Sequence, residues 1–226
     1  MKNSTEVCNI IENYLDEILS LRSKKSLKKD NSFVSEGDLL IQKIILKYFE
    51  EKLPNHELIS EEMGPFLGSS WNMDGSYIIL DPIDGTENFI SGLKEWGVGF
   101  SIYTNGKHEE SCIFLPELNE KAITGLIQPK FESRIIGLSS SLKKKDFEEI
   151  ADGFEYRIIG CSMYNMLSAV RRSFKRFENV KGVNCWDILP GLNLALENNV
   201  NAYVDNVKYN GEILFPHKKY KIVIGD

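Results

Sequence analysis

The chain has 226 residues, 42% of them hydrophobic, so it can bury a large core as one domain or as two packed lobes. Its formal net charge is −6, from 27 basic and 33 acidic residues, which excludes the general basic face of a protein that binds nucleic acid polymers. The four cysteines are scattered without a CxxC pair, a pattern typical of reduced thiols and not of a disulfide framework or a zinc site.

The first predicted element is an amphipathic helix over residues 7–21, after the capping candidates Ser4 and Thr5. Acidic residues interrupt its apolar pattern, so the segment has the character of neither a signal peptide nor a membrane span, and we expect a cytoplasmic protein without a membrane partner. The basic and polar residues 24–32 predict an exposed loop. From this loop, Lys28 or Lys29 could lean over an anion site.

A second helix is predicted over Leu39–Leu53, because Asp38 can open it and Pro54 stops it. The short strand that follows ends at two adjacent carboxylates, Glu61 and Glu62. Adjacent carboxylates repel each other unless solvent or a cation relieves the repulsion. By itself, this pair is typical of ordinary surface charge.

The central motif is DPIDGTENF, which follows the apolar strand Tyr77–Leu80. Asp81 and Asp84 flank a proline that stiffens the turn, so both carboxylates can be held toward one point, as a hard cation requires. Gly85 lets the backbone approach a ligand, and Thr86 offers a hydroxyl and an N–H group at an expected helix start. The alternative is ordinary turn chemistry, which uses the same residue types.

Further along the chain, the pattern predicts an antiparallel sheet and then an alternation of strands and helices. The strands expected in the first part are 57–60, 77–80, 97–103, 111–115 and 122–127. The second part is expected to hold strands 134–138, 156–160, 175–180, 200–204 and 220–224 and helices 142–151, 163–174 and 187–197. We therefore predict an α+β lobe over residues 1–130 packed against an α/β lobe over residues 131–226.

Two helix starts in the second lobe can face a ligand. Asp187, which follows Trp186, either caps its helix or is recruited by a metal. Ser162, which follows Gly160-Cys161, either binds a phosphate through its hydroxyl and backbone or forms a plain helix cap.

Four motifs, KKDNSFVSEGD, SEE, DPIDGTENF and CWDILPG, occur together in the order and approximate spacing of one known set. Through them the chain, from its first helix to about residue 205, resembles the inositol monophosphatase family. This family belongs to the superfamily of Mg²⁺-dependent, lithium-sensitive phosphatases, with fructose-1,6-bisphosphatases and bisphosphate nucleotidases. The resemblance implies a layered αβαβα sugar-phosphatase fold and a phosphoric monoester hydrolase, and analogy alone suggests a homodimer.

The resemblance also implies a metal site. Glu61, Asp81 and the backbone carbonyl of Ile83 would hold one Mg²⁺, while Asp81, Asp84 and Asp187 would hold a second. Glu61 would share a third, weaker ion, so that two or three ions are expected. Carboxylate and carbonyl oxygens are the ligands that magnesium favours, and no histidine is needed.

Catalytic and substrate-binding roles are implied in the same way. Asp38 and Thr86 would position an activated water and accept its proton, with Glu61 as a further catalytic residue and Glu62 acting through waters. The phosphate oxygens would be received by backbone N–H groups at helix starts. The implied substrate-binding residues are Gly85, Thr86, Ser162 and Asp187.

The substrate expected from the resemblance is a small phosphate ester such as inositol monophosphate or a sugar phosphate. Val180, however, stands where inositol phosphatases carry an acid that binds ring hydroxyls. Residues 188–190 replace the usual small residues, and Pro190 is tolerated in the first turn of a helix. The KKDNS stretch resembles the bisphosphate nucleotidases, which act on adenosine 3',5'-bisphosphate, whereas Asn88-Phe89 resembles the inositol and sugar phosphatases. Adenosine 3',5'-bisphosphate hydrolysis and a non-catalytic phosphate- or metal-binding protein remain the alternatives.

Overall fold

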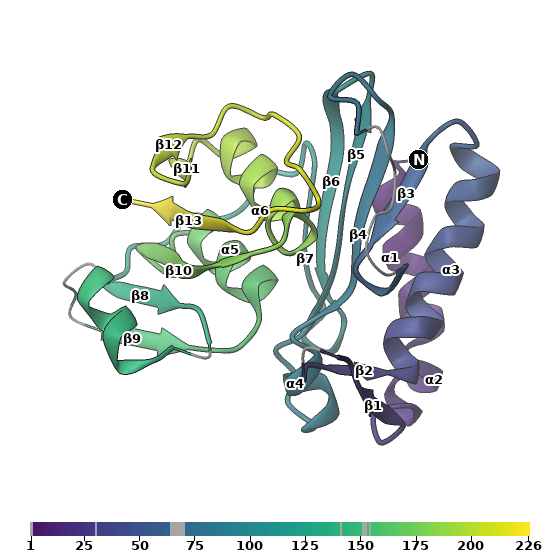
Figure 1. Cartoon of the computed structure of the whole chain (residues 1–226), viewed down its shortest axis with the longest axis horizontal. Coiled ribbons are helices and arrows are strands. Elements are labelled where there is room, and N and C mark those ends of the chain that lie inside the picture. Colours follow the sequence, from purple (N-terminus) through teal and green to yellow (C-terminus); the bar gives the residue numbers. More distant parts are fainter. Residues whose placement is uncertain (1, 30, 64–70, 141, 151–152, 154) are drawn as a thin grey trace.

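The computed structural model describes residues 2–29, 31–63, 71–140, 142–150, 153 and 155–226. Its helices are α1 (Asn3–Asn13), α2 (Leu15–Ser20), α3 (Glu36–Lys52), α4 (Thr86–Ile90), α5 (Ser162–Val170) and α6 (Cys185–Glu197), with short 3-10 segments η1 (Glu61–Met63), η2 (Pro116–Leu118) and η3 (Lys144–Glu149). Helices α1–α3 cover one face of a five-stranded sheet, and α5 and α6 lie between its other face and a six-stranded sheet (Figure 1). The predicted layered α/β fold class is confirmed. Within the described ranges, no helix combines the length and the apolar character needed to cross a membrane.

The five-stranded sheet has the order β3-β4-β5-β6-β7. Its strands are β3 (Glu57–Ser60), β4 (Tyr77–Asp84), β5 (Gly97–Thr104), β6 (Lys107–Leu115) and β7 (Glu120–Ile123). β4 to β7 are antiparallel neighbours, as the sequence predicts. β3 differs from the predicted antiparallel sheet, because it runs parallel to β4. Parallel neighbours need a long crossover connection, and the segment 61–76 between the two strands is long enough to supply it. Strand β4, between β3 and β5, continues past the predicted end at Leu80 to Asp84, so it includes both aspartates of the acidic motif.

The six-stranded sheet has the order β12-β11-β13-β10-β8-β9. Its strands are β8 (Ile135–Leu138), β9 (Glu155–Ile158), β10 (Arg176–Val183), β11 (Ala202–Val204), β12 (Val207–Lys208) and β13 (Tyr220–Gly225). β8 pairs in parallel with β9 and β10, whereas β13 is antiparallel to β10 and β11. The division of the chain into lobes 1–130 and 131–226 stays a prediction.

The helix predicted over residues 142–151 is wrong. The 3-10 segment η3 occupies residues 144–149, and Ala151 lies outside the described residues. The carboxylate of Asp146 accepts the backbone N–H of Lys143 at 2.7 Å. This bond caps the start of the segment, as the equivalent bond does in a helix. Phe147 is exposed, so the segment lacks the apolar packing that stabilises a longer helix.

Two N-terminal predictions also need correction. The single helix predicted over residues 7–21 is interrupted at Tyr14, which lies between α1 and α2. The φ and ψ angles of Tyr14 are −98° and 3°, which are not those of an α-helix. The basic loop is partly a hairpin, because β1 (Lys25–Leu27) pairs antiparallel with β2 (Phe33–Ser35). The side chains of β1 are exposed, as predicted for this stretch.

Helices begin earlier than predicted: α1 begins at Asn3, so the capping candidates Ser4 and Thr5 lie within it, and α5 begins at Ser162. The same is true of the two helices that carry acidic residues of the predicted site, α3 and α6. Helix α3 starts at Glu36, because the Ser35 hydroxyl accepts the N–H of Asp38 at 3.2 Å and the Asp38 carboxylate accepts the N–H of Ser35 at 2.8 Å. Helix α6 starts at Cys185, so Pro190 lies beyond the first turn and not within it. Both changes place an acidic residue of the predicted site within the first turn of a helix.

Strand β4 separates two hydrophobic clusters. Ile78 and Leu80 pack with α1–α3 on one face, whereas Ile79 packs on the other face in the cluster that contains the apolar residues of α5 and α6. This alternation is the period of a strand that is buried on both faces. Burial from both sides holds the end of β4, and with it Asp81 and Asp84, in one position.

A buried polar network fastens α6 to the five-stranded sheet. The Asn193 amide donates to the Tyr103 hydroxyl at 2.9 Å and to the Ser111 hydroxyl at 3.2 Å, and its carbonyl accepts the Tyr209 hydroxyl at 2.8 Å. These groups are buried, so each lost partner leaves a polar atom without water. The network therefore fixes the position of the helix that carries Asp187.

We expect Asn193→Ala to lower the free energy of unfolding by at least roughly 2 kcal/mol, because it leaves buried hydroxyls unsatisfied. Urea unfolding followed by circular dichroism measures this loss. The matched control is Asn201→Ala. The side chain of Asn201 is exposed, and its amide donates a hydrogen bond to Asp226 at the surface. Equal stabilities of the two variants would contradict the structural role of Asn193.

Candidate metal centre

The acidic motif lies on a bulge of β4. Asp81 pairs with Gly99 and Asp84 with Gly97, so β4 carries one more residue than β5 over this interval. A side chain at position 99 would collide with Met163 of α5 and approach Pro190 of α6. Glycine on β5 therefore lets both helices come close to the strand that carries the two carboxylates.

Three predicted metal ligands come together at this point. One carboxylate oxygen from each of Glu61, Asp81 and Asp187 lies within 4.8 Å of the others. They come from three elements: η1 directly after β3, the end of β4, and the first turn of α6. Since β3 and β4 are parallel neighbours, their carboxyl ends meet at one edge of the sheet.

Asp81 is the least satisfied of the three. It is fully buried, and neither carboxylate oxygen has a hydrogen-bond partner. Burial, followed by the charges of Glu61 and Asp187, raises the pKa of Asp81 well above its usual range. A buried, unpartnered carboxylate is unfavourable unless a cation binds it, so the oxygen donors present fit a hard divalent metal ion.

Asp187 and Asp84 are each restrained by a helix start. The Asp187 carboxylate accepts the backbone N–H of Asn184 at 2.8 Å, so it caps α6 while facing the acidic cluster. Asp84 is not one of the three grouped carboxylates. It accepts the N–H of Met163 and the Cys161 thiol at 3.0 Å, and burial raises the pKa of Asp84 to about 6.

The predicted water-positioning residues also lie together. The Thr86 hydroxyl is 3.3 Å from Asp38 Oδ1 and 3.0 Å from the Ile83 carbonyl oxygen. Burial raises the pKa of Asp38 to about 6. Gly85 precedes Thr86 as the cap of α4, with φ of 83°, a left-handed conformation that suits glycine.

The structure decides between Lys28 and Lys29, the two lysines that the sequence offered as neighbours of the site. Lys28 Nζ is 2.8 Å from Glu61 Oε1 and 2.6 Å from Glu62 Oε1, whereas Lys29 is exposed. Burial lowers the pKa of Lys28, but the two carboxylates outweigh burial and the net pKa is raised, so the side chain stays an ammonium. Burial also raises the pKa of Glu62, to about 7. Lys28 thus relieves the repulsion between the adjacent carboxylates.

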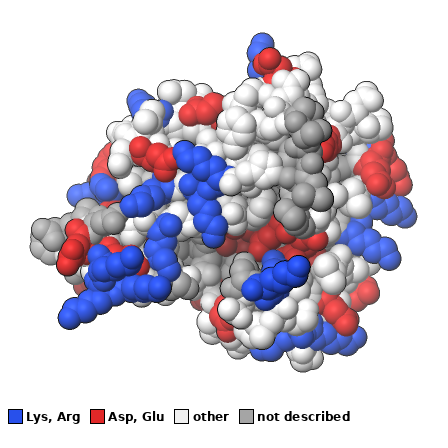
Figure 2. Space-filling view, viewed as in Figure 1, with Lys and Arg blue, Asp and Glu red and all other residues white. Residues whose placement is uncertain are grey.

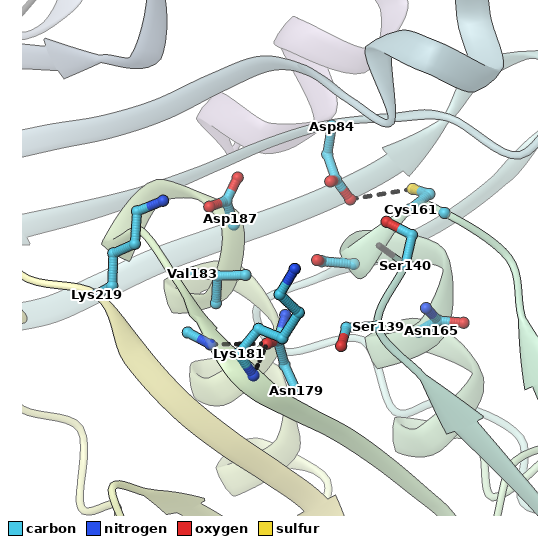
Figure 3. A pocket seen from close by; sticks show the side chains of 13 residues that line it. Asp84, Ser139, Ser140, Cys161, Asn165, Asn179, Lys181, Val183, Asp187 and Lys219 are labelled. Carbon is cyan, nitrogen blue, oxygen red and sulfur yellow. Dashed lines mark hydrogen bonds between the residues drawn. The ribbon is translucent and has the colours of Figure 1, made fainter. Parts of the chain in front are cut away.

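A cleft connects these groups to the second half of the chain. One cavity of about 340 Å³ is lined by Asp84, Asp187 and Ser162 together with residues of β10 (Figure 3). A second cavity, of about 510 Å³, is lined by Glu61, Gly85 and Thr86. Ser140 and Gly160 line both cavities. Figure 2 shows acidic side chains in this hollow and basic side chains beside it, over the six-stranded sheet.

The structure differs from the prediction at Ser162. The cap of α5 is Cys161, whose sulfur accepts the N–H of Tyr164 at 3.3 Å, so the plain-cap alternative for Ser162 is wrong. Ser162 is the first helical residue and lines the cavity. Sequence reasoning also missed Lys181, Lys219, Ser139 and Asn165, which line the same cavity and carry no motif of their own.

Comparison with known proteins gives partial sequence matches. The Nus factor SuhB of Pasteurella multocida is 30% identical over 95 residues, which are 42% of this chain and 34% of that protein. The Nus factor SuhB of Vibrio cholerae is 33% identical over 93 residues, 41% of this chain and 34% of that protein. The matched segment thus spans about a third of the length of these curated relatives.

Similarity in structure extends further along the chain. A staphylococcal inositol monophosphatase-1, solved as a LiCl-soaked inhibitory complex, has a TM-score of 0.78 at 18% identity, over 96% of this chain and 86% of that one. An IMPase/NADP phosphatase solved with Mg²⁺ and phosphate has a TM-score of 0.77 at 20% identity, with the same coverage. At these identities the likeness establishes the fold.

The sequence model of one family covers the first half of the chain. It is the inositol monophosphatase family, and its match extends over residues 1–131, which include Glu61 and the whole DPIDGTENF motif. Because this match spans more than half of the chain and the fold agrees, the chain belongs to the inositol monophosphatase family.

Proposed function

We propose that the chain is a Mg²⁺-dependent phosphoric monoester hydrolase that acts on a small phosphate ester, such as inositol monophosphate or a sugar phosphate. The observation that carries this proposal is the cluster of Glu61, Asp81 and Asp187, in which Asp81 is buried with both carboxylate oxygens unpartnered. Oxygen-only ligands suit a hard divalent cation. The likeness in fold to a phosphatase solved with Mg²⁺ and phosphate supports the same proposal.

The proposed cofactor is Mg²⁺, with two or three ions. Glu61, Asp81 and Asp187 would hold the metal, and Asp84 and the carbonyl of Ile83 would be further ligands. Bound there, Mg²⁺ supplies Lewis-acid chemistry, which activates water and neutralises charge on the leaving oxygen. No histidine is needed, in keeping with the preference of magnesium for oxygen.

The remaining roles fall to side chains and amides around that cluster. Thr86, with its hydroxyl between Asp38 and the Ile83 carbonyl, would orient the attacking water. Asp38 would accept the proton that the water loses, because its raised pKa lies closer to neutral pH than the pKa of an ordinary aspartate. The N–H groups of Gly85 and Thr86, with Ser162 across the cleft, would bind the phosphate oxygens during in-line displacement.

Three broader properties belong to the same proposal. Lithium sensitivity is supported by the likeness in fold to the staphylococcal enzyme solved as a LiCl-soaked inhibitory complex. A cytoplasmic location and a homodimer remain expectations from the sequence and the family. Lithium titration of phosphate release and light scattering of the purified chain test the first and the last.

The alternatives are adenosine 3',5'-bisphosphate hydrolysis and a non-catalytic relative. The second is favoured by the curated matches, which are named as Nus factors and not as phosphatases. Phosphate release from inositol monophosphate, sugar phosphates and adenosine 3',5'-bisphosphate, each with Mg²⁺ and with EDTA, separates the three. Release that requires Mg²⁺ supports a phosphatase and ranks the substrates, whereas no release from any ester supports the non-catalytic relative.

We expect Asp84→Asn to lower kcat by on the order of a thousandfold, because a metal ligand loses its charge. The fold should persist, since the amide oxygen can still accept the N–H of Met163. Initial rates of phosphate release and thermal unfolding by circular dichroism measure the two effects. The control is Asp74→Asn, a change of the same chemistry at an exposed position. Near-normal turnover by the Asp84 variant would contradict the metal assignment.

We expect Lys28→Gln to destabilise the chain by roughly 1 kcal/mol in EDTA, because Glu61 and Glu62 lose their charged partner. Addition of Mg²⁺ should stabilise this variant more than the wild type, since the ion then supplies the missing positive charge. Urea unfolding with EDTA and with Mg²⁺ measures both effects.

The control for this prediction is Lys29→Gln, which removes the same charge one residue away at an exposed position. It should resemble the wild type in both conditions. An equal Mg²⁺ response of the wild type and the Lys28 variant would show that the ion and the lysine do not share Glu61.

A further inference from the structure

Two lysines stand across the cavity from the proposed metal ligands. Asp84 and Asp187 line the 340 Å³ cavity together with Lys181 of β10 and Lys219 of the segment before β13, and the Lys219 amine points toward Asp187 (Figure 3). Neither lysine has a role in the proposed reaction. A ligand that reaches from the carboxylates to the lysines therefore meets a second, positively charged end of the same cavity.

The fold brings these lysines together through a bulge in β10. Asn179 pairs with Ile222 and Val183 with Tyr220, so β10 carries two more residues than β13 over the same interval. The Asn179 side chain accepts the N–H groups of Lys181 and Gly182, at 3.1 and 3.0 Å, which holds the bulge closed.

Gly182 shows how close the two lysines lie. It has φ of 92°, and a Cβ built there would be 3.3 Å from Lys219 Cβ. The backbone next to Lys181 thus lies close to the side chain of Lys219. A side chain at position 182 would be strained and would crowd Lys219, so glycine allows both lysines to sit at the cavity.

Two residues that line the cavity each carry a polar atom that is buried behind the cavity surface and has no hydrogen-bond partner. The atoms are Ser139 Oγ and Asn165 Oδ1, in residues whose exposed fractions are 8% and 1%. Buried polar atoms in native proteins nearly always have a hydrogen-bond partner. The Ser139 hydroxyl can donate or accept and the Asn165 carbonyl oxygen accepts, so each can bind a ligand hydroxyl when its side chain turns toward the cavity.

On the basis of the proposed phosphatase function, we propose that this cavity binds a leaving group that carries hydroxyls and a second anionic group. Lys181 and Lys219 contact the second anion, and Ser139 and Asn165 bind the hydroxyls. A leaving group that is a neutral polyol brings no negative charge to the two lysines. A leaving group with a phosphate or a carboxylate can form charge-assisted hydrogen bonds with them. The preferred substrates are therefore phosphate esters that carry a second anionic group, which we call doubly anionic esters. Esters whose only anionic group is the phosphate to be cleaved are called singly anionic.

The test is a kinetic comparison of matched esters with Mg²⁺. Glucose 6-phosphate has a neutral leaving group, 6-phosphogluconate adds a carboxylate, and glucose 1,6-bisphosphate adds a phosphate. Adenosine 3'-monophosphate and adenosine 3',5'-bisphosphate form a second matched pair. We expect kcat/KM to be at least about tenfold higher for the doubly anionic members, with the larger gain identifying carboxylate or phosphate as the second anion.

The variant that tests the lysines is Lys181→Gln/Lys219→Gln. It should raise KM for the doubly anionic esters about tenfold, with little change in kcat, and leave the singly anionic esters within about twofold. The control Lys208→Gln removes a charge from an exposed position in the same sheet and should change neither. An unchanged ratio between doubly and singly anionic esters in the double variant would overturn the proposal.

A second variant tests the unpartnered hydroxyl. Ser139→Ala removes an atom that has no hydrogen-bond partner, so the melting temperature should not fall, while KM for the preferred ester should rise. A clear fall in melting temperature with KM unchanged would mean that the hydroxyl already has a structural partner, which contradicts its role in ligand binding.

Failure of the proposed function is distinguishable from failure of this inference. If the wild type releases no phosphate from any ester, it is not a phosphatase for these compounds, and the same esters become stable ligands for calorimetric titration with Mg²⁺. Tighter binding of the doubly anionic members, lost in the double lysine variant, would then support the cavity assignment. Equal binding of singly and doubly anionic members would overturn it.

Discussion

The structure depends on holding several carboxylates close together in a place with little water. Such an arrangement is unfavourable by itself, since burial and mutual repulsion both disfavour the charged forms. The protein relieves it one group at a time: Lys28 pairs with Glu61 and Glu62, the start of α5 donates to Asp84, and the backbone before α6 donates to Asp187. Asp81 alone among the acidic cluster has no donor, which leaves it as the natural centre of a metal site.

The two halves of the chain share this task. The five-stranded sheet contributes Glu61 and Asp81, and α6 contributes Asp187 from beyond residue 131. Glycine opposite Asp81 lets α5 and α6 approach, and the Asn193 network holds α6 against the sheet. The Asn88 amide adds a further tie, since it donates to the Ile159 carbonyl across the cleft at 2.8 Å. The site therefore requires both halves to be folded and docked.

The cleft has opposite charge on its two sides. Its acidic side suits cations and, through them, a phosphate group, while Lys181 and Lys219 on the other side suit an anion. A ligand that spans both sides must match this order of charges. In the proposed function, the reacting phosphate and the leaving group would therefore be bound by different elements, β4 with α6 for the phosphate and β10 with the segment before β13 for the leaving group.

Local sequence determined the elements and most of the acidic ligands. Hydrophobic periodicity located the strands of the five-stranded sheet, and the spacing in DPIDGTENF indicated carboxylates at the end of a buried strand, because strand ends and turns are local features. Periodicity was insufficient at Tyr14, where no glycine or proline marks the break between α1 and α2. It was also insufficient over residues 142–151, where the exposed Phe147 shows that the apolar positions do not pack as those of a longer helix would.

Tertiary structure alone decided which groups meet. Lys28 rather than Lys29 reaches Glu61 because the hairpin of β1 and β2 sets its direction, and Cys161 rather than Ser162 caps α5 because Asp84 binds that helix start. Lys181 and Lys219 lie together only through the bulge between β10 and β13. Sequence by itself determined the kinds of ligand and their strands, since these follow from neighbouring residues. The arrangement around the cleft is set by packing between segments far apart in the chain, which no local pattern encodes.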